Sequence, residues 1–210
     1  MLNNKIKLKS GFTIIETMVS VSIFIIIVMA GMTALLNANL VHNVSQNMSS
    51  IMDNLNFVMD DMTKNLREGD TYDCINDIPS SVVATSGEDC KGIAFKSGND
   101  DGTINYFVYY LDDSSSGSYQ IWRYSSNNIA GINDITNYTQ MTSGDQLSIK
   151  NYQNVFSVLG AAKPILNAGT YTGDLQQPLV TIKLAGSIKY KNTETPFSLQ
   201  TSVSQRSKDN

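Results

Sequence analysis

One carboxylate, Glu16, stands inside an apolar segment near the N-terminus, GFTIIETMVSVSIFIIIVMAGMTALL, which covers residues 11–36. From Met18 to Leu36 the segment carries no charge and no proline. A helix needs roughly 20 such residues to cross a bilayer. A charged side chain at the centre of such a helix costs roughly 2.5–3.5 kcal/mol on insertion. The carboxylate of Glu16 therefore needs a partner charge or a place at the lipid headgroups.

The residues before this segment are basic: Lys5, Lys7 and Lys9. Basic residues flanking a membrane helix favour the cytoplasmic side, so we expect a cytoplasmic N-terminus and an exported C-terminal part. A cleavable secretory signal is the alternative, but its apolar core is about 7–15 residues long. The present segment is longer and its acid comes at the start, which disfavours a signal-peptidase site at residues 29–31.

The order of these features resembles the class III signal of type IV pilins and of the pseudopilins of type II secretion. The resemblance lies in Lys9-Ser10-Gly11-Phe12-Thr13-Ile14-Ile15-Glu16 and continues through residues 18–21. It implies cleavage by a prepilin peptidase between Gly11 and Phe12, N-methylation at Phe12, and assembly of the apolar helices into a filament core. The implied partners are the peptidase, the inner membrane and other pilin or pseudopilin subunits.

A charge pair accounts for Glu16 in physical terms. After such a cut, Phe12 carries a free α-amine, and Glu16 lies one helical turn away, within reach of the amine of a neighbouring copy. A buried charge is tolerable when it is paired, and a single buried polar group can fix the register between helices. The alternative is a single-pass anchor for an exported binding or adhesin domain that does not polymerise. That alternative leaves the Gly11–Phe12 junction unexplained.

The two cysteines, Cys74 and Cys90, are the next candidates for chemistry. A pair of cysteines in an exported domain favours a disulfide, and two free buried thiols are the alternative. Two thiols without a nearby histidine make a poor zinc site, because structural zinc takes four ligands.

Enzymatic chemistry is not indicated, and we expect no cofactor. The single histidine, His42, follows the apolar segment and has no neighbouring nucleophile. The acidic turns at residues 99–102 and 112–113 hold oxygen ligands that suit calcium, but Asp, Asn and Gly are also typical of tight turns, which we favour. Aromatic residues gather at 106–124, where sheet core is a more common role than ligand binding.

The element that must position the N-terminal residues is a long helix, expected over residues 13–67. Beyond the apolar segment, a stripe at spacings of three and four predicts an amphipathic continuation. Gly69, after Arg67, ends it. The stripe consists of Val41, Val44, Met48, Ile51, Leu55, Val58 and Met62. The expected divisions are a leader (1–11), a transmembrane or filament-core helix (12–36), the amphipathic continuation (37–68) and a β-rich globular domain (69–210).

Residues 69–210 are expected to form an antiparallel sheet, because apolar and polar residues alternate along the expected strands. Residues 69–92 are expected to form an irregular connection. Residues 125–145 and 160–178 are expected to form surface loops, where specificity would lie. The expected strands are 93–96, 103–111, 119–124, 155–159, 180–184, 188–190 and 197–203. The predicted fold class is α+β, with the long helix packed on the sheet.

The net charge of the chain excludes one further class of function. Without residues 1–11 and their three lysines, 12 basic residues remain against 19 acidic ones, a formal charge of −7. This balance argues against general nucleic-acid binding.

Residues 60–68 and 197–206 resemble the minor-pilin group that includes the J-type pseudopilin, which implies a minor subunit with a priming or tip role. Whether the filament is a pilus, a secretion apparatus or a DNA-uptake apparatus stays open.

Overall fold

A computed structural model describes residues 11–98, 102–112, 119–142, 147–151, 153–161, 165–167, 170–172, 176–190 and 193–206. The chain forms two compact units, residues 1–46 and 47–210, which are described separately below. The predicted leader, residues 1–11, lies outside the described residues except for Gly11.

Helix α1 covers Ile14–Glu68, which confirms the helix predicted over residues 13–67. Its end is set by packing: a Cβ added at Gly69 would lie 2.5 Å from Cδ2 of Phe95, so only glycine lets the chain leave the helix here. The Gly69 N–H donates to the Leu66 carbonyl at 3.2 Å, which tightens the last turn.

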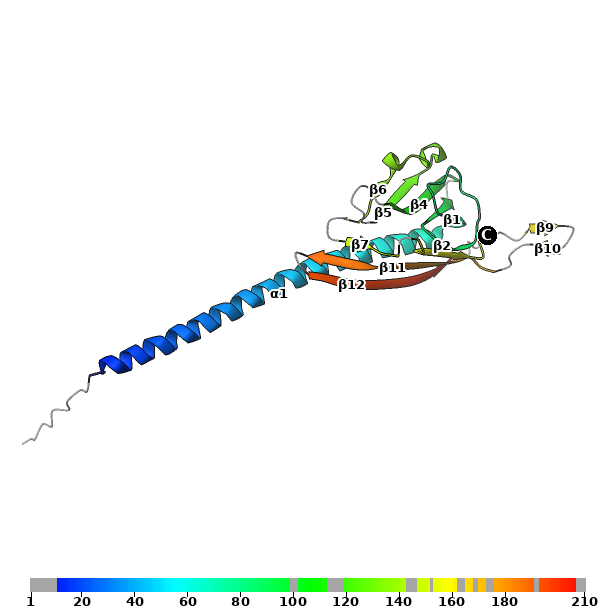
Figure 1. Cartoon of the computed structure of the whole chain (residues 1–210). Coiled ribbons are helices and arrows are strands. Elements are labelled where there is room, and N and C mark those ends of the chain that lie inside the picture. Colours follow the sequence, from blue (N-terminus) through cyan, green and yellow to red (C-terminus); the bar gives the residue numbers. More distant parts are fainter. Residues whose placement is uncertain are drawn as a thin grey trace, which may run out of the picture. The chain divides into compact units, whose positions relative to one another are not determined.

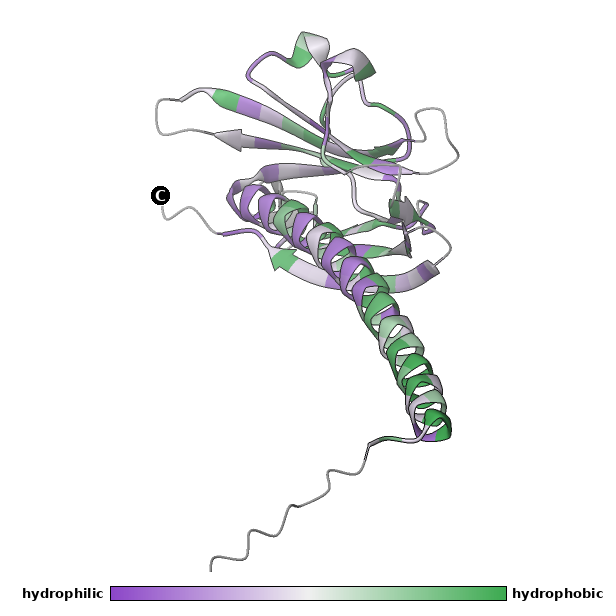
Figure 2. Cartoon of the chain, turned by 90° about the vertical axis from the view of Figure 1, so that its left-hand side faces the viewer, coloured by the Kyte–Doolittle hydropathy of each residue, from purple (hydrophilic) through white to green (hydrophobic). Residues whose placement is uncertain are grey.

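In the first unit, every described side chain of α1 is exposed except the half-buried Val44. Figure 2 shows that the beginning of this helix is predominantly apolar, and residues 18–36 carry no charge. A helix that is apolar all round is suited to a membrane or to the core of an assembly.

The second unit is built from two antiparallel sheets of five strands each, with a separate hairpin. The first sheet has the order β1-β3-β4-β5-β6, made of Asp70–Ile75, Gly92–Gly98, Ile104–Asp112, Gln120–Ser126 and Thr139–Gln140. The second has the order β12-β11-β8-β2, made of Thr193–Ser204, Leu179–Tyr190, Phe156–Leu159 and Gly87–Cys90, and β7 (Leu147–Ile149) also pairs with β11. The hairpin consists of β9 (Ile165–Asn167) and β10 (Thr170–Thr172).

The part of α1 from residue 47 lies between these two sheets (Figure 1). Its buried side chains are Leu55, Val58, Met59, Met62 and Leu66. They share one core with residues of both sheets, so the predicted α+β packing of helix on antiparallel sheet is confirmed. The predicted stripe reaches this core from its middle onward, whereas Val41 is exposed.

The alternation predicted for the last third of the chain is confirmed. In β11 the side chains of Val180, Ile182 and Leu184 are buried, and in β12 those of Phe197 and Val203 are buried. The two strands pair along twelve residues without a register shift, from Leu179 opposite Ser204 to Tyr190 opposite Thr193.

The expectation of an irregular connection over residues 69–92 was wrong, because β1 and β2 lie within it. Both strands carry interruptions that hide their pattern. Thr71 and Asp89 have positive φ values of 56° and 61°. The pairing of β1 shifts between Asp70 and Asp73, and that of β2 shifts between Gly87 and Cys90. Bulged strands lose the clean two-residue period on which the prediction depended.

The two predicted surface loops also contain structure. Residues 125–145 include the 3₁₀ turns Ile129–Gly131 and Ile135–Asn137, and Ile132 and Tyr138 between and after them are buried. These residues cover the second face of the first sheet, where a separate core forms. Residues 160–178 contain the β9–β10 hairpin.

Candidate functional site

The predicted cleavage junction lies directly outside the helix. Gly11, Phe12 and Thr13 are exposed and not helical, and α1 begins at Ile14. The Thr13 hydroxyl accepts the backbone N–H of Glu16 at 3.3 Å, and the Thr13 carbonyl accepts the same N–H at 3.1 Å. Thr13 therefore caps the helix. A peptidase would meet the Gly11–Phe12 bond in backbone that is free of helical hydrogen bonds.

Glu16 is the third residue of the helix, on the first turn. A carboxylate at this position interacts favourably with the unpaired N–H groups of the helix start. From Phe12 to Met52 it is the only Asp, Glu, Lys or Arg. The role of Thr13 was missed from the sequence, although the spacing Thr-x-x-Glu is the signature of a capping box. The pairing of Glu16 with Phe12 of another copy stays a prediction.

Polar side chains within the apolar segment bond to their own helix. Thr17 Oγ1 donates to the Ile14 carbonyl at 2.8 Å, and Ser20 Oγ donates to the Glu16 carbonyl at 2.7 Å. Ser22 and Thr33 make the same kind of bond at 2.8 and 2.9 Å, to carbonyls three or four residues back. These hydroxyls therefore need no partner outside the helix.

The helix α1 is long and apolar enough to cross a membrane. Its large apolar side chains from Ile14 to Val41 are well exposed, from 37% for Val28 to 82% for Ile14. Isolated in water, such a surface would be strongly unfavourable. The His42 ring, farther along, lies 3.0 Å from the Gln46 amide and faces solvent.

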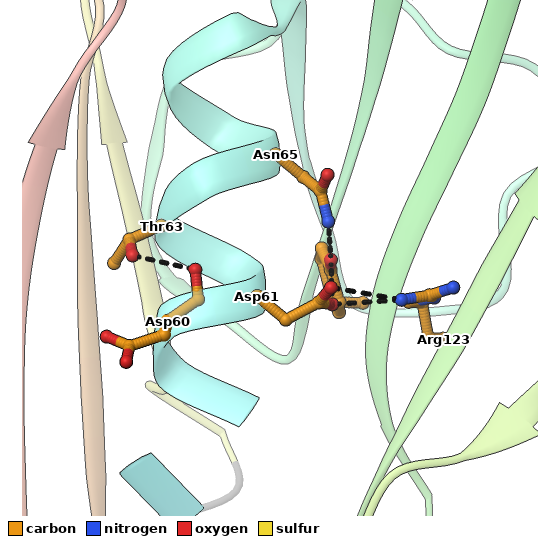
Figure 3. A network of polar contacts seen from close by, with 6 residues as sticks. Asp60, Asp61, Thr63, Asn65 and Arg123 are labelled. Atoms are coloured by element: carbon orange, nitrogen blue, oxygen red, sulfur yellow. Dashed lines mark hydrogen bonds and ion pairs between the residues drawn. The ribbon is translucent and has the colours of Figure 1, made fainter. Parts of the chain in front are cut away.

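A polar network holds α1 to the first sheet within the second unit (Figure 3). Arg123 Nη1 lies 3.1 Å from both carboxylate oxygens of Asp61. The Tyr109 hydroxyl donates to Asp61 Oδ2 at 2.7 Å and accepts from Asn65 Nδ2 at 2.8 Å. Burial is the main cause that raises the pKa of Tyr109 above its ordinary value, and its bond to Asp61 adds to this.

The predicted disulfide between Cys74 and Cys90 is present, with a Cα–Cα distance of 5.4 Å. It joins β1 of the first sheet to β2 of the second, and Cys90 is fully buried. A Cβ at Gly87 would lie 2.6 Å from Cys74 Sγ, so the glycine makes room for the bridge.

The acidic turns and the aromatic residues, the remaining candidates for ligand binding, do not form a single site. The acidic turns lie largely outside the described residues, and the part that the structure describes holds no group of three His, Cys, Asp or Glu that could bind a metal. The aromatic residues of β4 and β5 divide between two faces: Phe107 and Tyr109 belong to the main core, and Tyr110 and Tyr124 to the second core.

A polar surface pocket of about 390 Å³ lies beside the second sheet. Its lining consists of Asp89, Lys150, Asn151, Gln153 and Asn154. The ammonium of Lys150 is paired with Glu194 at 2.9 Å, and both side chains are more than half exposed. The amide of Asn151 bonds to β11, where it donates to the Lys183 carbonyl and accepts from the Ala185 N–H. These contacts explain the lining as support for the sheet.

Compared with protein-family models, curated proteins and solved structures, the chain has no match. The family resemblance therefore depends on the N-terminal residues and on the short segments named above.

Proposed function

We propose that this chain is a structural subunit, a minor pilin or pseudopilin, that a prepilin peptidase processes and that assembles through its N-terminal helix into a type IV pilus or a type II secretion-like filament. One observation carries the proposal. An exposed, non-helical Gly11–Phe12 junction stands directly before a long helix whose apolar part, up to Met52, holds a single charged residue, Glu16, in its first turn.

The exposed apolar surface supports assembly by helix packing. Ile14 and the apolar residues that follow can be buried only by lipid or by other chains. Before assembly, the helix would lie in lipid as a single-pass anchor with its N-terminus in the cytoplasm. In a filament, the helices of neighbouring copies would bury the same surface.

Processing would give Glu16 its partner. Cleavage between Gly11 and Phe12 removes Lys5, Lys7 and Lys9 and leaves a cationic amine on Phe12. A subunit that enters a filament core with an unpaired carboxylate loses more free energy than one whose carboxylate meets a cation. The amine of a neighbouring Phe12 would supply that cation, and the pair would select one stagger between helices.

The second unit would then be the exported part of the subunit. Its disulfide suits an oxidising compartment. The resemblance of residues 60–68 and 197–206 to minor subunits supports a priming or tip role.

The experiment is an intact mass measurement on full-length protein coexpressed in membranes with a prepilin peptidase. We expect the loss of residues 1–11 and the addition of one methyl group. Glu16→Ala should still be cleaved but should fail to enter filaments, and Glu16→Gln separates the loss of charge from the loss of side-chain volume. Thr17→Ala, one residue away, is the matched control and should assemble normally.

A full-length, unmodified mass, under conditions in which a control pilin is processed, would overturn the proposal. The chain would then be better described as a single-pass anchor that carries an exported binding domain.

A further inference from the structure

Strand β12 forms an open edge of the second sheet. It pairs with β11 on one side, and no strand among the described residues pairs with its other side. Figure 1 shows it at the rim of the second unit. The chain leaves this edge at Arg206, whose backbone N–H donates to the Arg67 carbonyl at the end of α1, at 2.9 Å.

The register identifies which backbone groups point outward. Proline has no N–H, so Pro196, opposite Ser187, takes a position whose N–H side faces away from β11. At the other end, the Gln205 N–H donates to the Pro178 carbonyl, which places the odd-numbered residues on the bonded side. Backbone N–H and C=O groups alternate between the two sides of a strand. Those of Ser198, Gln200 and Ser202 therefore point outward.

Among the described residues, this edge lacks the usual protection against pairing from Ser198 to Ser204, whereas at Arg206 the outward N–H is already bonded to the Arg67 carbonyl at the end of α1. Natural edge strands are blocked by charges, bulges or a covering element. From Thr195 to Gln205 there is no charged residue, and β12 pairs with β11 without a bulge. Pro196 interrupts only the beginning of the strand.

The two faces of β12 differ in character. The side chains of Ser198, Gln200 and Ser202 are exposed on one face. On the other face Phe197 and Val203 enter the main core. A strand added at the edge would extend both faces if its residues alternated in the same way.

The charges near the two ends of β12 favour one direction for the added strand. Two exposed arginines, Arg67 and Arg206, are joined through their backbones where β12 ends. At the other end, Lys150 and Lys189 are also basic, but both lie beside the carboxylate of Glu194, which is paired with Lys150 and stands opposite Lys189. An antiparallel strand begins opposite the end of β12, so an acidic residue at its start would face the arginines.

We propose that β12 is an acceptor edge for an extended segment of another protein, which pairs antiparallel to β12, carries an acid near its start, and alternates apolar and uncharged polar residues after it. The inference does not depend on processing at Gly11–Phe12, although the argument against a second copy rests on the parallel helices of the proposed assembly. A second copy fits less well. β12 and the part of α1 from residue 47 run in the same direction (Figure 1), so copies packed side by side with parallel helices would not present antiparallel edges.

The probe is a fluorescent peptide with the sequence of residues 193–206, TETPFSLQTSVSQR. In a register centred on Gln200, this peptide pairs its residues 198–202 with residues 202–198 of β12 and places its Phe197 opposite Val203. Its Glu194 then lies beyond the paired residues, at the end of β12 where Arg206 is bonded to the end of α1. A scrambled peptide of the same composition is the control. Binding is measured by fluorescence anisotropy with the full-length protein in detergent micelles.

The matched variants test the backbone itself. Gln200→Pro removes one outward N–H and should weaken peptide binding roughly tenfold or more, while Gln200→Ala keeps that N–H and should bind as the parent does. Arg206→Ala should weaken binding at low salt, and high salt should abolish the difference.

Hydrogen exchange of the unmodified protein gives an independent readout. The amides of Ser198, Gln200 and Ser202 should exchange fast without peptide and slowly with it, whereas those of Leu199 and Thr201 should be slow in both cases. Equal binding of the scrambled peptide, equal binding by the two Gln200 variants, or slow exchange of the outward amides in the free protein would each overturn the proposal. A dimer that Gln200→Pro abolishes would instead identify a second copy as the occupant.

Discussion

The Tyr109 hydroxyl of β4 donates a 2.7 Å hydrogen bond to Oδ2 of Asp61, 48 residues earlier in helix α1. The same carboxylate forms an ion pair with Arg123 of β5, whose Nη1 lies 3.1 Å from Asp61 Oδ2. One helical side chain thus joins two neighbouring strands. Because Asp61 is only about one-fifth exposed, loss of its carboxylate would leave partly buried polar groups without a partner.

Replacement of Asp61 by alanine should therefore lower the free energy of unfolding by about 2–3 kcal/mol, since hydrogen bonds to charged groups are worth about 1.5–3 kcal/mol each. Asp60→Ala is the matched control, because the Asp60 side chain is exposed and should change stability by less than about 0.5 kcal/mol. Urea unfolding followed by near-ultraviolet circular dichroism measures both. Equal effects of the two variants would show that the network contributes nothing.

Stability should fall in alkaline solution because of buried tyrosines. Burial raises the pKa of Tyr72, Tyr109 and Tyr138 above the ordinary value of 10.0. Above about pH 10 the unfolded chain releases these protons while the folded chain keeps them, so unfolding becomes more favourable as pH rises. The contribution of these groups is fully present below that pH.

Urea unfolding at a series of pH values, with the absorbance of tyrosinate as a second probe, tests this expectation. Tyr109→Phe should give a shallower alkaline decline than the parent. A decline of the same slope in both proteins would exclude Tyr109 as a cause.

Reduction of the Cys74–Cys90 bridge should cost about 3 kcal/mol of stability, given its sequence separation of 16. The bridge connects strands of two different sheets, so the loss should also loosen β2. Thermal unfolding with and without reductant measures the change. The double variant Cys74→Ser, Cys90→Ser should be insensitive to reductant, and any remaining sensitivity would point to another cause.

The cap at Thr13 should matter locally. Thr13→Ala should destabilise the first turn of α1 by about 1 kcal/mol and speed hydrogen exchange of the Glu16 amide, whose N–H the Thr13 hydroxyl accepts. Thr13→Ser keeps the hydroxyl and should exchange as the parent does. Exchange that is unchanged in Thr13→Ala would show that the cap is not formed in solution.

Local patterns predicted much of this fold. The stripe from Val44 to Met62 has helical spacing, and Val180 to Leu184 alternates, so a helix and a half-buried strand follow from periodicity alone. Both predictions depend on neighbours within a few residues. The disulfide also followed from composition, because only Cys74 and Cys90 were available.

Long-range features could not be predicted in the same way. The residues near Asp61 in the sequence do not indicate that it contacts Tyr109 and Arg123, which lie 48 and 62 residues away. β1 and β2 escaped detection because Thr71 and Asp89 take left-handed backbone conformations within them. The polar composition of residues 125–145 favoured a surface loop, so the burial of Ile132 and Tyr138 was not predicted. These two residues cover the second face of the first sheet, which is itself apolar.

The hydroxyl bonds inside the first unit have a consequence for how the helix is oriented about its axis. Thr17, Ser20, Ser22 and Thr33 direct their hydrogens back to their own helix, so none of them marks a preferred side. Around the circumference of residues 14–36, only Glu16 breaks the uniformity. In the proposed assembly, the rotation of each helix about its axis would therefore be fixed at one angular position, close to one end. The remaining apolar length would allow any rotation that buries it against lipid or another helix.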